Sequence, residues 1–408
     1  MNILCVKCKG RKLCGRAICP ITAKSEALFK VKELTEKDFF GSSPAPFVGH
    51  YGYPYVNVGI LSPPIITEDA WEYDAPRHWA VSNYEIPQIV DYRSALINSR
   101  FKAQIKEKSS RFLELSQEIG MASKPVDVEI NLKKKPFVRM DFSPEVAPMG
   151  PRGELKSAKA TENPKIHAKV DKVVSDTDLK ATDAILYLYK NEFDENFLSR
   201  MLSIGTLGLK KNRKLVPTRW SITACDDILG KNFINKIKDY QAANYQIYFG
   251  GYLGNYFLIM LFPEMWSYEL FETYAPKASW NTSQEVQFTT DYEPYGGRKT
   301  YAENCIGGYY SNRVVITEKL ANLKRQASVL SLRFITGEYS VPLGVWVVRE
   351  ATRKALSSKP IEFSSKELML SYAKNLVKEK FNINTDQILK HSILLKSIKQ
   401  QSKLTQFF

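Results

Sequence analysis

Two hydrophobic periods run through this chain, and together they predict both strands and helices. Val126 to Leu132 alternates apolar and polar residues, the pattern of a half-buried strand. Asn244 to Phe249, Tyr256 to Phe262 and Ser267 to Tyr274 are strand-like runs joined by turns that contain glycine or proline, which predicts an antiparallel meander. Lys169 to Val174 is also interpreted as a strand.

Helical spacing dominates the remainder of the second half. From Thr317 to Ile335, apolar residues recur at helical intervals, which predicts one long helix. Ser364 to Phe381 and Thr385 to Lys399 predict two further helices, and Ile86 to Leu115 predicts a helical region with a break near 106–110. The mixture predicts an α+β fold, in which a mixed core with an antiparallel meander is flanked by helices.

Changes in composition divide the chain into five predicted segments. Prolines cluster between 133 and 164, which predicts a flexible loop there. Residues 351–408 carry eleven Lys and Arg against four Asp and Glu, so this end is strongly basic. The expected segments are a four-cysteine knuckle at 1–22, an N-terminal part of the core at 23–165, an α+β core at 166–360, basic helices at 361–400, and a flexible partner-binding tail at 401–408.

The overall charge narrows the classes of partner. The 408 residues are 44% hydrophobic, as in a folded globular protein, and carry a net charge of +15 with a pI near 9.3. Such a surplus of Lys and Arg favours polyanionic partners, with nucleic acid first and an anionic membrane as the competitor. The uncharged stretch 240–263 contains polar and glycine residues and alternates like strands, which argues against a spanning helix. We expect a cytoplasmic, nucleoid-associated protein without a membrane partner.

Four of the six cysteines lie within the first nineteen residues. Cys5, Cys8, Cys14 and Cys19 have the spacing C-x2-C-x5-C-x4-C, and basic residues surround them without an acidic residue. Four thiols so close together in an intracellular chain favour a metal site over disulfides, and tetrahedral zinc suits four thiolates. The pattern predicts a zinc knuckle that faces phosphate. An iron–sulfur cluster is the alternative.

The residues from Gln401 onward have the pattern Q-x-x-L-x-x-F-F. One helical turn after Gln401 would place Leu404, Phe407 and Phe408 on one apolar face, while the Gln401 amide fills a polar pocket. The pattern resembles the peptide that docks client proteins onto the DNA sliding clamp PCNA. Burial of the three apolar side chains, roughly 1.5–3 kcal/mol each, exceeds an ordering cost of about 2–5 kcal/mol. The tail is therefore predicted to bind PCNA reversibly. The alternatives are a frayed C-terminus that happens to end in two aromatic residues, and aromatic residues that fold back onto the chain's own core.

A basic segment in the core predicts a phosphate or nucleic-acid site. Its Lys and Arg side chains can neutralise phosphates, and its tryptophan can stack on an unpaired base. The residues concerned are Lys210, Lys211, Arg213, Lys214, Arg219 and Trp220. A solvated basic loop beside a core tryptophan is the simpler alternative.

Two acidic pairs are candidates for a metal-dependent reaction. Asp176 with Asp178, and Asp226 with Asp227, follow apparent strands, where paired carboxylates could hold Mg²⁺ for phosphoryl transfer. A helix N-cap is the simpler role for each pair. The glycine turn at 307–308, which precedes the predicted long helix, could present backbone N–H groups to an anion.

Several longer blocks together resemble the archaeal Nre DNA-repair family. These are H-Y-G-Y-P-Y-V-N-V-G-I-L at 50–61, K-V-D-K-V-V-S-D-T-D-L-K-A at 169–181, K-K-N-R-K-L-V-P-T-R-W-S-I-T-A at 210–224, D-Y-E-P-Y-G-G-R at 291–298, G-G-Y-Y-S-N-R at 307–313 and V-P-L-G-V-W-V-V-R-E at 341–350. The resemblance implies a role in DNA-damage repair, a four-cysteine metal-binding segment and, in one branch, a C-terminal PCNA peptide. It implies no particular reaction.

Three functional hypotheses follow. The first is a repair factor that PCNA recruits to DNA and that binds DNA by its basic surfaces. The second is a metal-dependent enzyme acting on nucleic acid or a nucleotide, with the aspartates as metal ligands and Arg213 or Arg219 on phosphate. The third is a non-catalytic adaptor that joins the clamp to other repair proteins.

Overall fold

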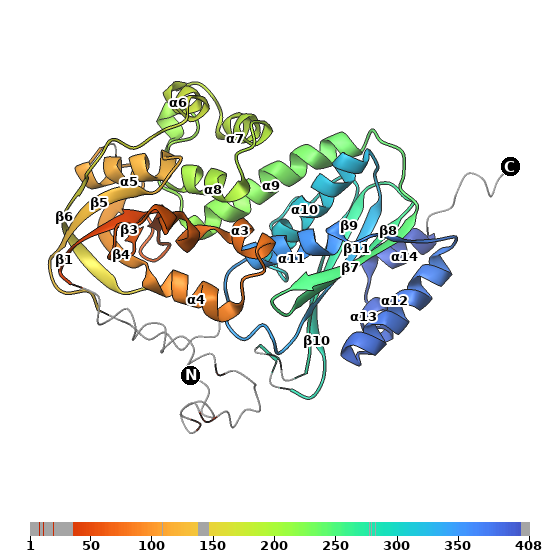
Figure 1. Cartoon of the computed structure of the whole chain (residues 1–408). Helices are drawn as coiled ribbons and strands as arrows, with labels where there is room; N and C mark the ends of the chain where they lie inside the picture. The colour runs from red at the N-terminus through yellow and green to blue at the C-terminus, as the bar shows by residue number, and fades with distance from the viewer. Residues whose placement is uncertain are drawn as a thin grey trace. The chain divides into compact units, whose positions relative to one another are not determined.

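The computed structural model describes residues 36–107, 109–137, 147–276, 278, 280–281 and 283–400, together with Cys8, Arg11 and Cys19 (Figure 1). The described residues form two compact units, an N-terminal unit that ends at Leu229 and a C-terminal unit that begins at Gly230. The helix α9 (Thr218–Ile237) runs from the first into the second. No helix in the described ranges has both the length and the apolar character needed to span a bilayer.

The N-terminal unit is built on a six-stranded sheet with the order β1-β5-β6-β4-β3-β2. Its strands are β1 (Asp38–Ser43), β2 (Ala45–Val48), β3 (Tyr55–Ser62), β4 (Ile97–Gln104), β5 (Val126–Leu132) and β6 (Arg152–Ala160). Neighbouring strands are antiparallel except β4 and β6, which are parallel. The predicted strand β5 is confirmed, and its residues alternate buried and half-buried because the core covers one face of it.

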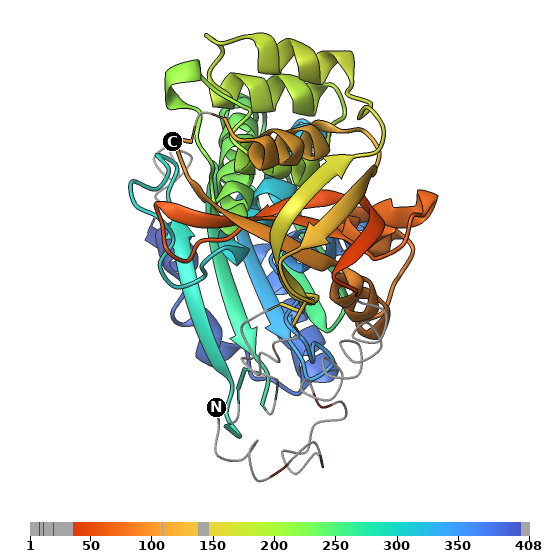
Figure 2. The same ribbon diagram turned by 90° about the vertical axis from the view of Figure 1, so that its left-hand side faces the viewer.

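Short helices surround this sheet. They are η1 (Glu68–Asp74), α3 (Pro76–Val81), α4 (Ile86–Ala95), α5 (Arg111–Met121), α6 (Ala168–Ser175), α7 (Ala181–Lys190), α8 (Glu195–Ser203) and η2 (Lys210–Asn212). Leu113 and Ile119 of α5 are buried in one cluster with Ile60 of β3 and Val128 of β5. Figure 2 shows α5, in brown-orange, packed against the strands of this sheet.

The C-terminal unit contains a second six-stranded sheet, with the order β10-β9-β11-β8-β7-β12. Its strands are β7 (Tyr245–Tyr252), β8 (Asn255–Phe262), β9 (Ser267–Tyr274), β10 (Gln287–Glu293), β11 (Ser328–Ile335) and β12 (Ile361–Phe363). The three strands of the predicted meander exist. However, β11 lies between β8 and β9, antiparallel to the first and parallel to the second, so only β7 and β8 are adjacent.

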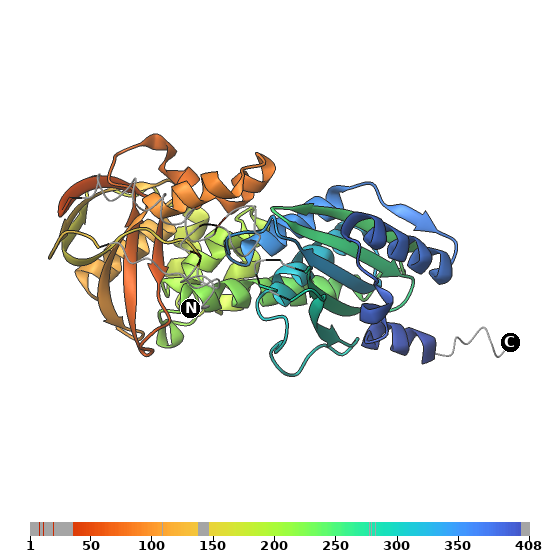
Figure 3. The same cartoon turned by 90° about the horizontal axis from the view of Figure 1, so that it is seen from below.

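Helices cover both faces of the second sheet. α10 (Gly308–Leu323) and α11 (Trp346–Ser357) lie on one face (Figure 1). On the other face lie α12 (Lys366–Phe381), α13 (Asp386–Leu389) and α14 (Ile393–Gln400) (Figure 3). Met369, Leu389 and Leu394 of these helices are buried in one cluster with residues of the strands. Because both faces are covered, every residue of β11 is buried. The predicted mixed α+β core is therefore present.

Four local predictions were wrong. The long helix predicted at 317–335 ends at Leu323, and the next residue, Lys324, has a left-handed φ of 52°. The rest of that range contains the strand β11. A strand buried on both faces has no alternation that would distinguish it from a helix. The predicted strand at 169–174 is α6, whose buried Val170 and Val173 have helical spacing. The region predicted as helical at 86–115 contains β4, and the predicted loop at 133–164 contains β6.

Candidate nucleic-acid interface

A turn between β2 and β3 presents tyrosines to solvent. Gly49 donates its N–H to the Asn57 carbonyl at 2.8 Å, and Tyr55 donates to the Gly52 carbonyl at 2.8 Å. Gly52 has a φ of +82°, which glycine adopts without steric cost. Three aromatic residues of this turn, Tyr51, Tyr53 and Tyr55, have exposed fractions of 77%, 43% and 64%.

Ile105 and Thr218 join this turn to the basic segment that precedes α9. The Ile105 N–H donates to the Pro54 carbonyl at 3.0 Å, and the Ile105 carbonyl accepts from the Leu215 N–H at 2.8 Å. The Thr218 hydroxyl accepts a hydrogen bond from the Val48 N–H at 2.9 Å. The start of α9 is thereby fixed beside the tip of the β2–β3 hairpin.

The aromatic side chains of the two segments meet in solvent. The ring centroids of Tyr53 and Trp220 lie 5.3 Å apart with an interplanar angle of 55°, and the exposed fraction of Trp220 is 45%. Exposed Lys and Arg side chains lie on the same segments. We call the following exposed residues the aromatic–basic surface: Tyr51, Tyr53, Tyr55, Lys106, Lys210, Lys211, Lys214, Arg219 and Trp220.

The segments that supply this surface are basic, although the acidic turn at Asp176–Asp178 lies beside Lys210, whose N–H donates to the Thr177 carbonyl at 2.9 Å. Residues 39–67 and 196–225, which supply all of the surface except Lys106, contain no Asp or Glu. The carboxylate of Glu107 accepts a hydrogen bond from a backbone N–H of its own turn. Partial burial and the nearby Arg219 guanidinium lower the pKa of His50 below its usual value, because both disfavour its charged form. These features suit a polyanion better than a cationic partner.

Arg213, predicted to hold phosphate, has a structural role instead. Its Nε donates to the Gly208 carbonyl, its Nη1 to the Val174 carbonyl and its Nη2 to the Asp176 carbonyl, each at 2.8 Å. The guanidinium thus ties the basic segment to the end of α6. The exposed lysines on either side of it remain available to solvent.

The two acidic pairs do not lie at strand ends. Asp176 follows α6, and its Oδ1 accepts from the N–H groups of Asp178 and Leu179 at 3.0 Å, which closes the turn between α6 and α7. The N-cap of α7 is Lys180, so the predicted N-cap role for this pair was wrong. Asp226 and Asp227 lie within α9, where Asp226 is fully buried. Among the residues whose positions are described, no three His, Cys, Asp or Glu side chains form a metal-binding group. The Mg²⁺ site stays a prediction.

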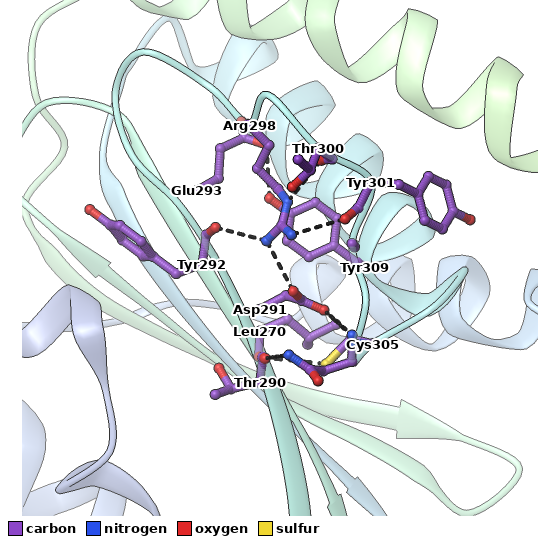
Figure 4. A network of polar contacts seen from close by, with 12 residues as sticks. Leu270, Thr290, Asp291, Tyr292, Glu293, Arg298, Thr300, Tyr301, Cys305 and Tyr309 are labelled. Atoms are coloured by element: carbon purple, nitrogen blue, oxygen red, sulfur yellow. Dashed lines mark hydrogen bonds and ion pairs between the residues drawn. The ribbon is translucent and has the colours of Figure 1, made fainter.

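The side chains of the block at 291–298 hold the loop that follows β10 in place. Arg298 Nη1 lies 3.0 Å from Asp291 Oδ1, and the same guanidinium donates to three backbone carbonyls, those of Tyr292, Thr300 and Tyr301 (Figure 4). The second oxygen of Asp291 accepts from the N–H groups of Asn304 and Cys305. One ion pair therefore fixes both ends of the loop between β10 and α10.

A buried ion pair holds α10 against the same sheet. Arg313 Nη1 lies 2.6 Å from Glu293 Oε2, and side-chain exposure is only 3% for Arg313 and 1% for Glu293. The same carboxylate accepts from the Tyr309 hydroxyl at 2.8 Å and from Trp266 Nε1 at 3.4 Å. Each oxygen of the Glu293 carboxylate therefore has a hydrogen-bond donor, which makes its buried charge tolerable.

The glycine turn before α10 is occupied by the protein's own carboxylate. Gly307 has a φ of +80°, and a Cβ on Gly308 would lie 2.2 Å from Glu272 Oε1. That oxygen is in turn 2.5 Å from Arg333 Nη1. A carboxylate beside this helix start disfavours an external anion there, and the predicted anion site stays a prediction.

The sequence interpretation missed the hairpin tyrosines. Trp220 was singled out, but its partner Tyr53 is 167 positions earlier in the chain and only the fold brings the two together. One signal was present, namely a tyrosine- and glycine-rich run inside a long stretch without acidic residues.

The predicted knuckle falls mostly outside the described residues, and the predicted tail falls wholly outside them. Of the four knuckle cysteines, Cys8 and Cys19 are described, and both are buried.

Comparison with known proteins identifies the class. Residues 13–281 match the family described as "Archaeal Nre, N-terminal", and residues 293–407 match "Archaeal Nre, C-terminal". The chain belongs to this archaeal Nre family, as its sequence blocks predicted. No solved structure matches it.

Similar proteins are known in two archaea. A protein of Archaeoglobus fulgidus named "DNA repair protein NreB" is 37% identical over 98% of both chains. A second protein of that organism, "DNA repair protein NreA", is 37% identical over 93% of this chain and 95% of its own. "DNA repair protein NreA" of Haloferax volcanii is 36% identical over 78% of both.

Proposed function

We propose that this protein is a DNA-repair factor that holds DNA on the aromatic–basic surface. The names of its relatives support the repair role. The observation that carries the DNA contact is the exposed Tyr53–Trp220 pair among exposed Lys and Arg, on two segments without a carboxylate. Lys and Arg would neutralise phosphates, and the rings would supply the contacts that do not depend on charge.

The DNA contact is tested by measuring affinity for a labelled oligonucleotide over a range of salt concentrations. The intact chain is compared with Lys210→Ala/Lys211→Ala and with the control Lys133→Ala/Lys135→Ala. The control lysines are also exposed and lie two positions apart, but they pair with the carboxylates of Glu154 and Glu36. Weakened binding and a flatter salt dependence in the first variant alone would support the proposal. An equal effect of both variants would contradict it.

The proposed recruitment to DNA depends on the C-terminal peptide. Gln401, Leu404, Phe407 and Phe408 would dock onto the PCNA clamp, and α14, which ends at Gln400, would attach that peptide to the C-terminal unit. Titration of the clamp with the intact chain and with Phe407→Ala/Phe408→Ala tests this, with Lys403→Ala as a control inside the same peptide. Equal binding by all three chains would refute clamp docking.

We further propose that Cys5, Cys8, Cys14 and Cys19 hold zinc. Four thiolates are the donor set of structural zinc sites, and the burial of Cys8 and Cys19 fits ligands withdrawn from solvent. When bound, the ion would cross-link the segment and carry no reaction. Metal analysis of the purified chain and of Cys8→Ser/Cys19→Ser provides the test. Stoichiometric zinc that is lost in the variant is expected, whereas iron with acid-labile sulfide would establish the cluster alternative.

A further inference from the structure

We infer that the aromatic–basic surface binds DNA through unpaired bases, so that its ligand is single-stranded DNA or a duplex with bases displaced from the helix. This inference rests on the proposed DNA contact and specifies the form of DNA recognised. The determining side chains are Tyr53 and Trp220. Tyr51 and Tyr55 extend the same surface, and the lysines and Arg219 contact the strand's phosphates.

Exposure of the rings is the first argument. Tyr53 and Trp220 contact each other at 5.3 Å, yet nearly half of each residue's surface is open to solvent. Tyr51 and Tyr55 are more exposed still, at 77% and 64%. Four large aromatic residues exposed on two joined segments lose hydrophobic stabilisation unless a ligand covers them. A ligand that has flat, apolar faces would cover them best.

Rigidity of the rings' attachment is the second argument. The main chains that carry them are joined through Ile105, whose N–H binds Pro54 and whose carbonyl binds Leu215, and through the bond from Val48 to Thr218. The mutual contact of the two rings further restricts their rotation. A base that stacks on Trp220 or Tyr53 therefore meets a surface that is already arranged, so little conformational entropy is lost on binding.

Duplex geometry is the third argument. In a continuous duplex the faces of the bases are covered by their neighbours, and only their edges and the backbone are accessible. Tyrosine and tryptophan rings at a hairpin tip and a helix start can contact base faces only where a base is unstacked, which costs a few kcal/mol in a duplex and least where the base is unpaired. A positively charged path with aromatic residues is the general arrangement for single strands, and it tolerates any sequence because every base has a π-face.

The test compares two DNA forms across four chains. A labelled oligonucleotide is offered alone or annealed to its complement, at one fixed salt concentration, to the intact chain, Trp220→Leu, Lys210→Ala/Lys211→Ala and Trp71→Leu. Trp71 is the matched control, since it is also an exposed tryptophan (39%) of the N-terminal unit but lies in η1 between Asp69 and Glu72. Thermal unfolding of each variant verifies that it is folded.

Trp220→Leu is expected to weaken single-strand binding about 5- to 150-fold, the range for loss of one stacked base, and duplex binding less than twofold. The lysine variant is expected to weaken both forms, and Trp71→Leu neither. Equal losses for the two DNA forms in Trp220→Leu would overturn the inference while leaving the proposed DNA contact intact. No loss for either form would also overturn it and would assign the rings to a protein partner. Failure of the intact chain to bind any DNA would overturn both.

A spectroscopic measurement separates stacking from a change in structure. The chain has six tryptophans, and Trp220 is expected to account for the quenching of emission when single-stranded DNA is added. Trp220→Phe keeps a stackable ring, so it should retain most of the affinity while losing that part of the quenching. If Trp220→Phe binds single strands as weakly as Trp220→Leu, stacking is not the contact and the inference is wrong.

Discussion

The two units use the same residue types in opposite ways. In the N-terminal unit, the rings of Tyr53 and Trp220 are in contact at the surface, on segments that also carry exposed Lys and Arg side chains. In the C-terminal unit, Tyr309 and Arg313 meet around Glu293 in an environment closed to solvent. Tyrosine, tryptophan and arginine in a short block therefore do not indicate a ligand site by themselves. What decides is whether the protein supplies their partners.

The same difference separates side chains that could bind a ligand from side chains that stabilise the fold. The Arg298 guanidinium donates to a carboxylate and to backbone carbonyls of its own loop and of β10 (Figure 4), whereas Lys210 and Lys211 are exposed in a stretch of sequence without carboxylates. The first arrangement stabilises a fold, and the second attracts an anion. Four measurements test this division.

The largest expected effect comes from Arg313→Met in the C-terminal unit. Removal of the guanidinium leaves the Glu293 carboxylate buried without its counter-charge, so the free energy of unfolding should fall by about 3–5 kcal/mol. Urea denaturation provides the measurement. Lys135→Met, which breaks the exposed pair with Glu36, serves as the control and should leave the midpoint unchanged. If the two variants behave alike, the buried network is not what holds α10.

The next effect is expected from Arg213→Met, within the basic segment itself. Three backbone carbonyls lose a charged donor, so the free energy of unfolding should fall by about 1.5–3 kcal/mol. The salt dependence of DNA binding should not change, because this guanidinium is not offered to phosphate. A flatter salt dependence for Arg213→Met would show that it contacts DNA after all.

Lys210→Ala/Lys211→Ala should give the reverse result. Both side chains are exposed, so the unfolding midpoint should not move. Loss of two phosphate contacts should reduce the slope of log K against log salt by about 1.4–1.8. Anisotropy titrations between low and moderate salt measure this slope. A destabilised variant with an unchanged slope would remove the distinction between these lysines and Arg213.

The smallest effect is a pH dependence in the C-terminal unit. Burial raises the pKa of Glu269 above its usual value, although bonds from Ser392 and two N–H groups partly oppose this shift. A raised pKa in the folded state means that the contribution of Glu269 to stability is fully present below its unfolded pKa, near 4.5, and declines as pH rises through the folded pKa. The stability of the intact chain relative to Glu269→Gln should therefore decrease between pH 4.5 and 7. If the difference in stability between the intact chain and Glu269→Gln stays constant with pH, the pKa of Glu269 is not raised in the folded state.

Sequence patterns succeeded where one physical factor dominated. β5 was predicted at its observed bounds because one face is covered and its residues alternate. The family blocks were sufficient to identify the family. β11 was mistaken for helix because both faces of the sheet are covered, which removes the alternation that marks a strand.

Pairings between distant segments could not be predicted. The 210–220 segment was recognised from its charge, but the contact of Trp220 with Tyr53 depends on bonds through Ile105 that no local pattern encodes. For the same reason Arg213 was grouped with the phosphate-binding residues. Its partners are backbone carbonyls, and the sequence does not show where a carbonyl points.

The attachment of α14 by Glu269 bears on the proposed docking to PCNA. Glu269 fixes the first turn of α14 to the second sheet, and the proposed docking motif begins at the residue after that helix ends. From Gln400 to Phe407 there are seven residues, which span at most about 25 Å when fully extended. If this peptide docks onto PCNA as proposed, the C-terminal unit would be held within that distance of the ring, at a high effective concentration. It could act only on DNA that lies next to the ring, and the position of the clamp would select which stretch of DNA it can reach.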